Sequence, residues 1–229
     1  MKSTYLKLFA ASLMALPFTS CNDYLDKEPM SEVTPDKGFA SEQDLQMYAN
    51  NLYTSVLPSH GNWSYGIYGD DNNTDNMVSL QPDGKFVPGD WKTSLNDNDN
   101  WKFTNINSIN YFFEQVLPRY EAEPIGINGS LEKIKHYIGE MYFMRAFEYF
   151  KLLQKFGDFP IITEPLTDDL AILTEANRRY PCNEVARFIL EDLDKAIELL
   201  EATSEATTRI NADVARLIKS RVALYEGSW

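Results

Sequence analysis

The sequence predicts an all-α protein. Five segments place apolar residues at the three- and four-residue spacing of one helix face, and no segment between them alternates as a half-buried strand would. The 229 residues are 44% hydrophobic and 13% aromatic, which is enough to bury a core. A chain of this length forms one domain or two small ones.

The first predicted helix follows Ser41. A hydroxyl at the N-cap with Asp44 three residues later is a capping-box pattern, and apolar residues then recur at helical spacing until Pro58. A second helix is predicted for residues 105–117, with four apolar side chains on one stripe and Pro118 directly after it.

The third predicted helix, residues 131–156, carries the longest apolar stripe and ends at Gly157. Arg145 falls on its apolar face, so we expect a buried, paired cation. The alternative is a side chain that extends along the helix surface until its charged end reaches solvent. His136 lies in the same helix and is expected at the surface, because that is the ordinary position of a polar side chain.

The fourth and fifth predicted helices cover residues 183–201 and 211–225. Together they form a hairpin of about the size of one helical repeat, a unit that normally stacks on neighbouring repeats. The chain ends directly after this hairpin, at Trp229, and we expect it to be truncated.

The N-terminus has the pattern of a secretory signal. The first seven residues include two lysines, Lys2 and Lys7, and the apolar run that follows is too short to span a membrane. That run leads to Phe18-Thr19-Ser20-Cys21, which resembles a bacterial lipobox, in which cleavage precedes a cysteine that is then acylated. The alternative is an ordinary signal peptide that happens to end near a cysteine.

We therefore expect three regions in the chain. Residues 1–20 form a lipoprotein signal peptide, residues 21–40 a polar tether anchored to the membrane through lipid on Cys21, and residues 41–229 a helical domain.

The charge and cysteine content exclude several classes of protein. The net charge is −13, and removing residues 1–20, which hold two lysines and no acidic residue, takes it to −15. A surface this acidic repels phosphate backbones. Nucleic acid is therefore not expected as a partner. The two cysteines, Cys21 and Cys182, cannot form a disulfide framework or a cysteine-rich zinc site.

A long polar segment, residues 58–99, interrupts the helical pattern and is rich in Trp, Tyr, Asp and Asn. Aromatic rings stack on the apolar faces of sugars, while carboxylates and amides bond their hydroxyls, so this composition favours a carbohydrate site. The alternative is that the rings pack the loop onto the helices and the polar side chains cap turns. The candidate glycan contacts are Trp63, Asp70, Asn76 and Trp91.

No motif in the sequence indicates a metal, a cofactor or catalysis. The acidic runs 70–75 and 96–100 lack the glycine and the distal glutamate of an EF-hand, so turn formation is the expected role. There is no nucleophile-elbow serine, P-loop, dinucleotide fingerprint or His-Glu-x-x-His motif. We expect no metal, no cofactor and no enzyme activity.

Four segments, in order, carry a family resemblance. They are residues 23–29, Trp101 with residues 106–112, residues 139–160, and residues 212–225. Together they resemble the SusD/RagB family of glycan- and nutrient-binding outer-membrane lipoproteins of Bacteroidetes. Residues 139–160 are the most specific match, although Met141-Tyr142 stands where the family usually has Ala-Arg, a difference expected to affect packing more than function.

The resemblance implies a tetratricopeptide-like helical superhelix, interrupted here by the long irregular loop, and a surface lipid anchor. It also implies a non-catalytic protein that delivers a glycan or oligosaccharide to a SusC-like TonB-dependent transporter. Family members are about twice this long, so the C-terminal half is expected to be missing. The alternative function is a lipid-anchored helical-repeat adaptor that binds protein or peptide. A third hypothesis is an anchored glycoside hydrolase, but the sequence contains no catalytic motif that supports it.

Overall fold

The computed structural model describes residues 38–58, 76–77, 80, 101–202 and 208–228. All of them lie in one compact unit of the chain. Within this described part, the residues form six helices and two isolated β-bridges, and all five helices predicted from the sequence are present. The all-α prediction is therefore confirmed.

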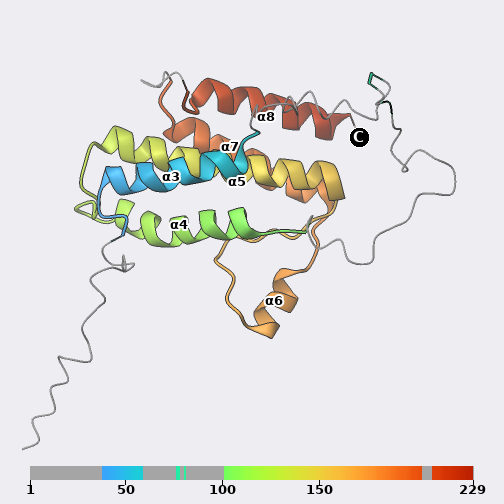
Figure 1. Ribbon diagram of the computed structural model, residues 1–229, viewed down its shortest axis with the longest axis horizontal. Coiled ribbons are helices and arrows are strands. Elements are labelled where there is room, and N and C mark those ends of the chain that lie inside the picture. Colours follow the sequence, from blue (N-terminus) through green and yellow to red (C-terminus); the bar gives the residue numbers. More distant parts are fainter. Residues whose placement is uncertain (1–37, 59–75, 78–79, 81–100, 203–207, 229) are drawn as a thin grey trace, which may run out of the picture. The chain divides into compact units, whose positions relative to one another are not determined.

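The helices follow one another in the order shown in Figure 1. Five of them coincide with the predicted segments to within a few residues, and α6 was not predicted. Their bounds are α3 (Glu42–Val56), α4 (Thr104–Tyr120), α5 (Leu131–Phe156), α6 (Leu170–Ala176), α7 (Cys182–Leu199) and α8 (Ala212–Gly227).

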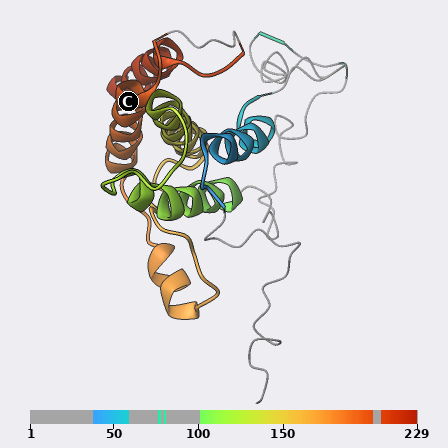
Figure 2. The ribbon, with the colours of Figure 1, turned by 90° about the vertical axis from the view of Figure 1, so that its left-hand side faces the viewer.

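Helix α5 is the centre of the bundle. It packs against α3, α4, α7 and α8, and α7 in turn packs against α8, as Figures 1 and 2 show from two sides. Sixteen of its 26 residues are buried, and residues 136–146 are buried without interruption. A helix that is covered on every side must bond its buried polar groups within the protein, and α5 does so for His136, Glu140 and Arg145.

Two glycines explain how α5 fits and where it ends. A Cβ on Gly139 would lie 3.0 Å from Leu200 Cγ and 3.1 Å from Leu199 Cβ, so only glycine lets α5 and the end of α7 approach this closely. Gly157 takes a φ of 67°, in the left-handed region that glycine adopts without strain, and ends the helix as predicted.

The predicted start of α3 is confirmed, while the predicted end of α4 is wrong. Ser41 caps α3 in a reciprocal capping box with Asp44. Helix α4 runs through Pro118 to Tyr120, because proline removes only its own N–H and the next turn still closes: the Glu121 N–H donates to the Leu117 carbonyl at 2.9 Å.

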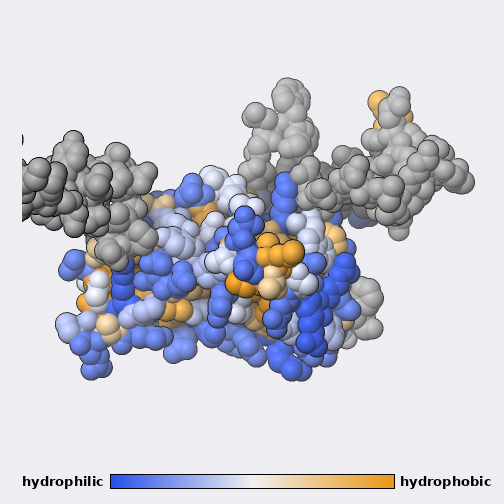
Figure 3. Space-filling model, turned by 90° about the horizontal axis from the view of Figure 1, so that it is seen from below, coloured by the Kyte–Doolittle hydropathy of each residue, from blue (hydrophilic) through white to orange (hydrophobic). Residues whose placement is uncertain are grey.

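Helix α6 lies apart from the other helices in both ribbon views (Figures 1 and 2). Asp169 caps it by accepting from the N–H groups of Ala171 and Ile172. None of its seven residues, all within the described part of the chain, is buried. Figure 3, which views the molecule from the side of α6, shows apolar residues gathered among hydrophilic ones.

Among the described helices, none has both the length and the apolar composition of a membrane span.

Candidate functional site

A pocket of about 490 Å³ opens where the C-terminal ends of α5 and α8 meet the N-terminal end of α7. Its volume lies within the range of sites for small molecules. The wall combines two aromatic rings with amide and charged side chains. These residues are Phe156 and Tyr225, with Gln154, Lys155, Asp158, Arg179 and Glu226.

The chain forms this pocket from helix ends. After α5 stops at Gly157, Asp158 caps the N-terminus of α7 by accepting from the Cys182 N–H at 2.9 Å. Phe159 and Tyr180 exchange two backbone hydrogen bonds of 3.2 and 3.0 Å, which brings the segment before α7 alongside the end of α5. Side chains from positions far apart in the sequence therefore meet around one space.

The two cations of the pocket lie on aromatic rings. The Arg179 guanidinium carbon is 4.8 Å from the centre of the Trp101 ring, and Lys155 Nζ is 5.7 Å from the centre of Phe156. Trp101 itself packs on Phe159 at 4.5 Å. Trp101 therefore supports the wall that presents Arg179.

This combination of groups suits a carbohydrate. The half-buried rings of Phe156 and Tyr225 add apolar surface to the wall, of the kind that the apolar side of a sugar contacts. The carboxylates of Asp158 and Glu226 accept hydrogen bonds from hydroxyls, and Arg179 donates them. The pocket therefore has the chemistry that the sequence predicted for the long loop, on a different part of the chain.

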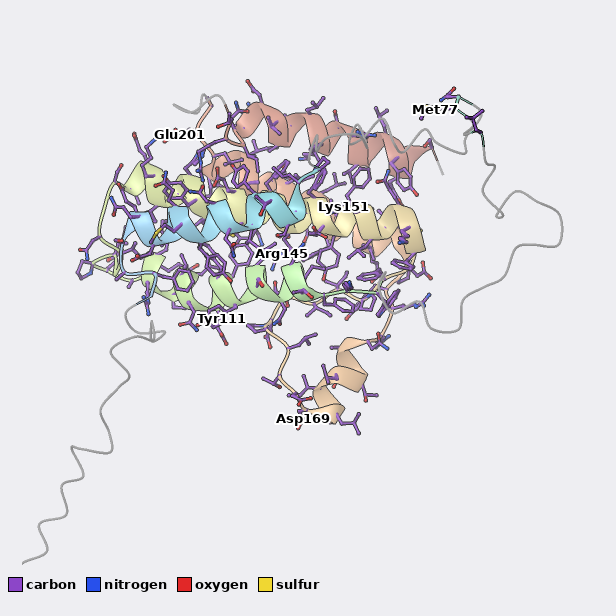
Figure 4. The ribbon with its side chains drawn as sticks, in the orientation of Figure 1. Met77, Tyr111, Arg145, Lys151, Asp169 and Glu201 are labelled. Atoms are coloured by element: carbon purple, nitrogen blue, oxygen red, sulfur yellow. The ribbon has the colours of Figure 1, made fainter. Side chains whose placement is uncertain are left out.

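Arg145 is buried and paired, as predicted, in the middle of the helical bundle (Figure 4). Its Nε and Nη2 donate to the two carboxylate oxygens of Asp192 at 2.7 and 2.9 Å, and Nη1 donates to Asn110 Oδ1 at 2.9 Å. The Asn110 amide donates in turn to the carbonyls of Ile162 and Glu164 at 2.9 and 3.2 Å. The network thus ties the segment that leads to α6 onto three helices.

Tyr149 holds the same segment from α5. Its hydroxyl accepts from the Ile162 N–H at 2.8 Å and donates to the Ile162 carbonyl at 3.2 Å. Burial raises the pKa of Tyr149 well above the usual value of a tyrosine, although the hydrogen bond with Ile162 acts in the opposite direction. The hydroxyl therefore stays protonated and able to donate.

A second buried network surrounds Glu140, and it corrects the expectation for His136. His136 is buried, and its Nε2 lies 3.2 Å from Glu140 Oε1, while Nδ1 accepts from the Glu201 N–H at 3.3 Å. Arg209 donates to both oxygens of Glu140 at 2.9 and 2.6 Å, and the Tyr53 hydroxyl donates at 2.5 Å. His136 is buried because it has a partner on each ring nitrogen.

The charge state of this network follows from its burial. Burial, followed by the nearby Glu140 charge, raises the pKa of Tyr53, which keeps its hydroxyl as a donor. Burial alone would lower the pKa of Arg209, but the hydrogen bonds to Glu140, together with the electrostatic effects of Glu140, Tyr53 and Tyr137, outweigh it and the pKa is raised. The Glu140 network holds α3, α5 and the segment before α8 together, so its role is structural.

The residues predicted to bind glycan are only partly placed by the structure. Asn76 is exposed and does not line the pocket. Trp63, Asp70 and Trp91 lie outside the described residues, and so does Cys21, the predicted lipid anchor.

The pocket residues were missed because they belong to separate helix ends that only the fold brings together. The one available signal was the segment 139–160, which the family resemblance singles out and which supplies Gln154, Lys155, Phe156 and Asp158. Across the described residues, no group of three or more His, Cys, Asp or Glu side chains is arranged to hold a metal ion.

The fold is that of a helical, tetratricopeptide-like protein. Residues 23–224 match the SusD-like family model described as "Starch-binding associating with outer membrane". The chain therefore belongs to the SusD/RagB family, which confirms the resemblance predicted from the sequence. At the level of the family, this is a group of carbohydrate-binding proteins associated with the outer membrane.

Individual relatives agree with this assignment. SusD-like protein P2 of Formosa agariphila is 27% identical over 201 residues, which are 83% of this chain and 37% of that protein. A SusD-like protein from Bacteroides fragilis has a solved structure that matches with a TM-score of 0.66 and 27% identity, over 87% of this chain and 38% of that one. A putative sugar binding protein from Bacteroides vulgatus shares the fold, with a TM-score of 0.60 and 19% identity, over 83% of this chain and 44% of that one.

The chain spans 37 to 41% of the length of the three curated relatives that it matches.

Proposed function

We propose that this protein binds a glycan or oligosaccharide and delivers it to a SusC-like TonB-dependent transporter, without catalysing a reaction. Carbohydrate binding is the activity of the family as a whole. The observation that carries the proposal for this chain is the pocket of about 490 Å³, because its two rings and its polar rim match the two kinds of surface on a sugar.

Location at the cell surface is part of the same proposal. Family membership supports a location at the outer membrane, because the family is described as associating with it. The lipobox-like sequence before Cys21 supports acylation of that cysteine, so that lipid holds the mature chain to the membrane.

We propose two groups of glycan contacts. The first is the pocket, where Arg179 is exposed and Glu226 half-buried, so both can reach a ligand. The second is the long loop, with Trp63, Asp70, Asn76 and Trp91, whose support remains their chemistry.

Glycan-array binding of the chain without residues 1–21, read beside its far-UV circular dichroism, tests the proposal. The variant Glu226→Ala removes a pocket carboxylate, and Trp91→Ala removes a loop ring. The matched control is Arg216→Ala, also on α8 but exposed and paired only with Asp213 one turn away. We expect a helical spectrum in every case, and about a tenfold loss of affinity when one hydrogen bond to the ligand is removed.

Each outcome distinguishes the sites. Loss of binding in Glu226→Ala but not in Arg216→Ala places the glycan in the pocket, and loss in Trp91→Ala places it on the loop. A helical chain that binds no glycan overturns glycan binding by this chain and favours the adaptor function, in which a protein or peptide is bound. Release of reducing ends from a bound polysaccharide would overturn the non-catalytic role.

A further inference from the structure

A second hollow lies beside the pocket at the ends of α5 and α8. It has a volume of about 320 Å³ and is formed by α5, α8 and the end of α3. Gln154 lines both hollows. The ring of Phe150 in the second hollow meets the ring of Tyr225 in the pocket edge to face, with their centres 5.7 Å apart. The two hollows are therefore neighbours, and together they are here called the α5–α8 groove.

The groove follows the direction of the two helices. Helices α5 and α8 run the same way (Figure 1), and each lines the second hollow first and the pocket about one turn later. On α5 the corresponding residues are Lys151 and Lys155, and on α8 they are Arg221 and Tyr225. One helical turn advances by about 5.4 Å, which is similar to the length of one sugar unit. The groove therefore has room for a chain of sugars rather than for a single unit.

The charged side chains of the groove are mostly basic, in a chain whose net charge is −13. Among the described residues, the groove is lined by the cations Lys151, Lys155, Arg179 and Arg221 and by the carboxylates Asp158 and Glu226. Lys151 is paired with Glu148, and Lys155 lies in the last turn of α5, where the helix dipole favours a cation. Local structure therefore accounts for the two lysines but not for the two arginines.

Arg179 and Arg221 are both exposed. Within the described part of the chain neither pairs with a carboxylate, although acidic residues outnumber basic ones by 34 to 21. Arg179 also lies two residues before Pro181, the N-cap of α7, where the positive end of the helix dipole disfavours a cation. Its guanidinium rests on the Trp101 ring, which leaves the N–H groups in the guanidinium plane available to a ligand. A cation placed against the local electrostatics points to a functional role.

We infer that the α5–α8 groove binds an anionic oligosaccharide, in which carboxylate or sulfate groups on different sugar units pair with Arg179 and Arg221. The inference rests on the proposed function for the sugar, and it adds the charge and the length of the ligand. A guanidinium donates two parallel hydrogen bonds to the oxygens of such an anion. The half-buried rings of Phe147 and Tyr225, one in each hollow, add the apolar surface that a sugar contacts.

The test measures binding of matched tetrasaccharides to the full chain in mild detergent, by isothermal titration calorimetry. One pair is an oligogalacturonate and its methyl ester, and the other is a sulfated galactan oligosaccharide and its desulfated form, so that the two pairs distinguish carboxylate from sulfate. The groove variants are Arg179→Gln and Arg221→Gln. The matched control is Arg216→Gln, which removes the same charge from an exposed arginine of α8 that pairs with Asp213.

We expect the charged member of at least one pair to bind at least about tenfold more tightly than the uncharged member, and less tightly as the salt concentration rises. Each groove variant should weaken that binding about fivefold, while the control stays within about twofold of the unaltered chain. The charged disaccharide should also bind about fivefold less tightly than the tetrasaccharide, because it cannot occupy both hollows.

Three results overturn the inference and leave glycan binding standing. They are equal affinity for the two members of both pairs, equal losses in the groove variants and the control, and equal affinity for the disaccharide and the tetrasaccharide. Binding of poly-glutamate as tight as that of the charged tetrasaccharide also overturns it, because the groove then recognises charge alone. A chain that is helical by circular dichroism and binds no glycan, charged or neutral, overturns the proposed function and the inference with it.

Discussion

Replacing Arg145 by methionine is the sharpest test of how this core is held together. Methionine keeps the length of the apolar stem but removes the guanidinium that bonds Asp192 through two oxygens and Asn110 through one. Asp192 is only 1% exposed, so it cannot exchange its lost partner for water. The variant Arg145→Met therefore leaves a carboxylate buried without its counter-charge.

The cost follows from these contacts. Breaking a buried ion pair from one side costs about 3–5 kcal/mol, because the remaining charge is uncompensated. The lost hydrogen bond to Asn110 adds about 1 kcal/mol. The free energy of unfolding of a whole domain is about 5–15 kcal/mol, so this single change removes a large part of it. In the double variant Arg145→Met/Asp192→Leu no charge is left, and we expect at least about 2 kcal/mol to be regained over the single variant.

Urea denaturation followed by circular dichroism at 222 nm measures these differences. The control is Lys151→Met, which breaks the ion pair of an exposed lysine with Glu148 and is expected to cost less than about 1 kcal/mol. The reasoning is refuted if Arg145→Met costs no more than the control, or if the double variant is no more stable than Arg145→Met.

Two further predictions concern packing and pH. Gly139→Ala pushes a methyl group against Leu199 and Leu200 and is expected to lower the free energy of unfolding by about 1–3 kcal/mol. Gly157→Ala, in contrast, meets no neighbouring atom and acts only through its positive φ. Equal urea midpoints for Gly139→Ala and the unaltered chain would contradict the first expectation. Burial raises the pKa of Tyr149, so the folded chain keeps a proton that the unfolded chain releases above about pH 10. The contribution of Tyr149 to stability is therefore complete below that pH and is lost as the pH rises, by up to about 1.4 kcal/mol per pH unit. Urea denaturation curves from pH 9 to 12 should show a midpoint that falls with pH. The fall should be less steep in the variant Tyr149→Phe.

Features that depend on neighbouring residues were predicted well from the sequence. The capping box of Ser41 and Asp44 is complete within four residues, and the end of α5 needs only the positive φ of Gly157. The burial of Arg145 followed from its place on an apolar helix face, although nothing in the sequence selected Asp192 as its partner. Helix periodicity shows which face is buried but not what it meets.

Features that depend on distant residues were missed. His136 is buried because Glu201, 65 positions away, donates to one ring nitrogen. Helix α6 escaped prediction because its seven residues have no buried face to create a periodic pattern. The pocket escaped for a related reason, since Arg179 and Glu226 reach it only when α5, α7 and α8 have packed together.

The central place of α5 has a consequence for how the chain is made. The apolar faces of α3 and α4 contact each other only slightly and are covered mainly by α5, which follows them in the sequence. During synthesis both helices therefore leave the ribosome before their common partner exists, and short isolated helices are only marginally stable in water. Until α5 is complete the chain has no core to close on, so α3 and α4 gain their tertiary stability only after the helix that follows them has been made.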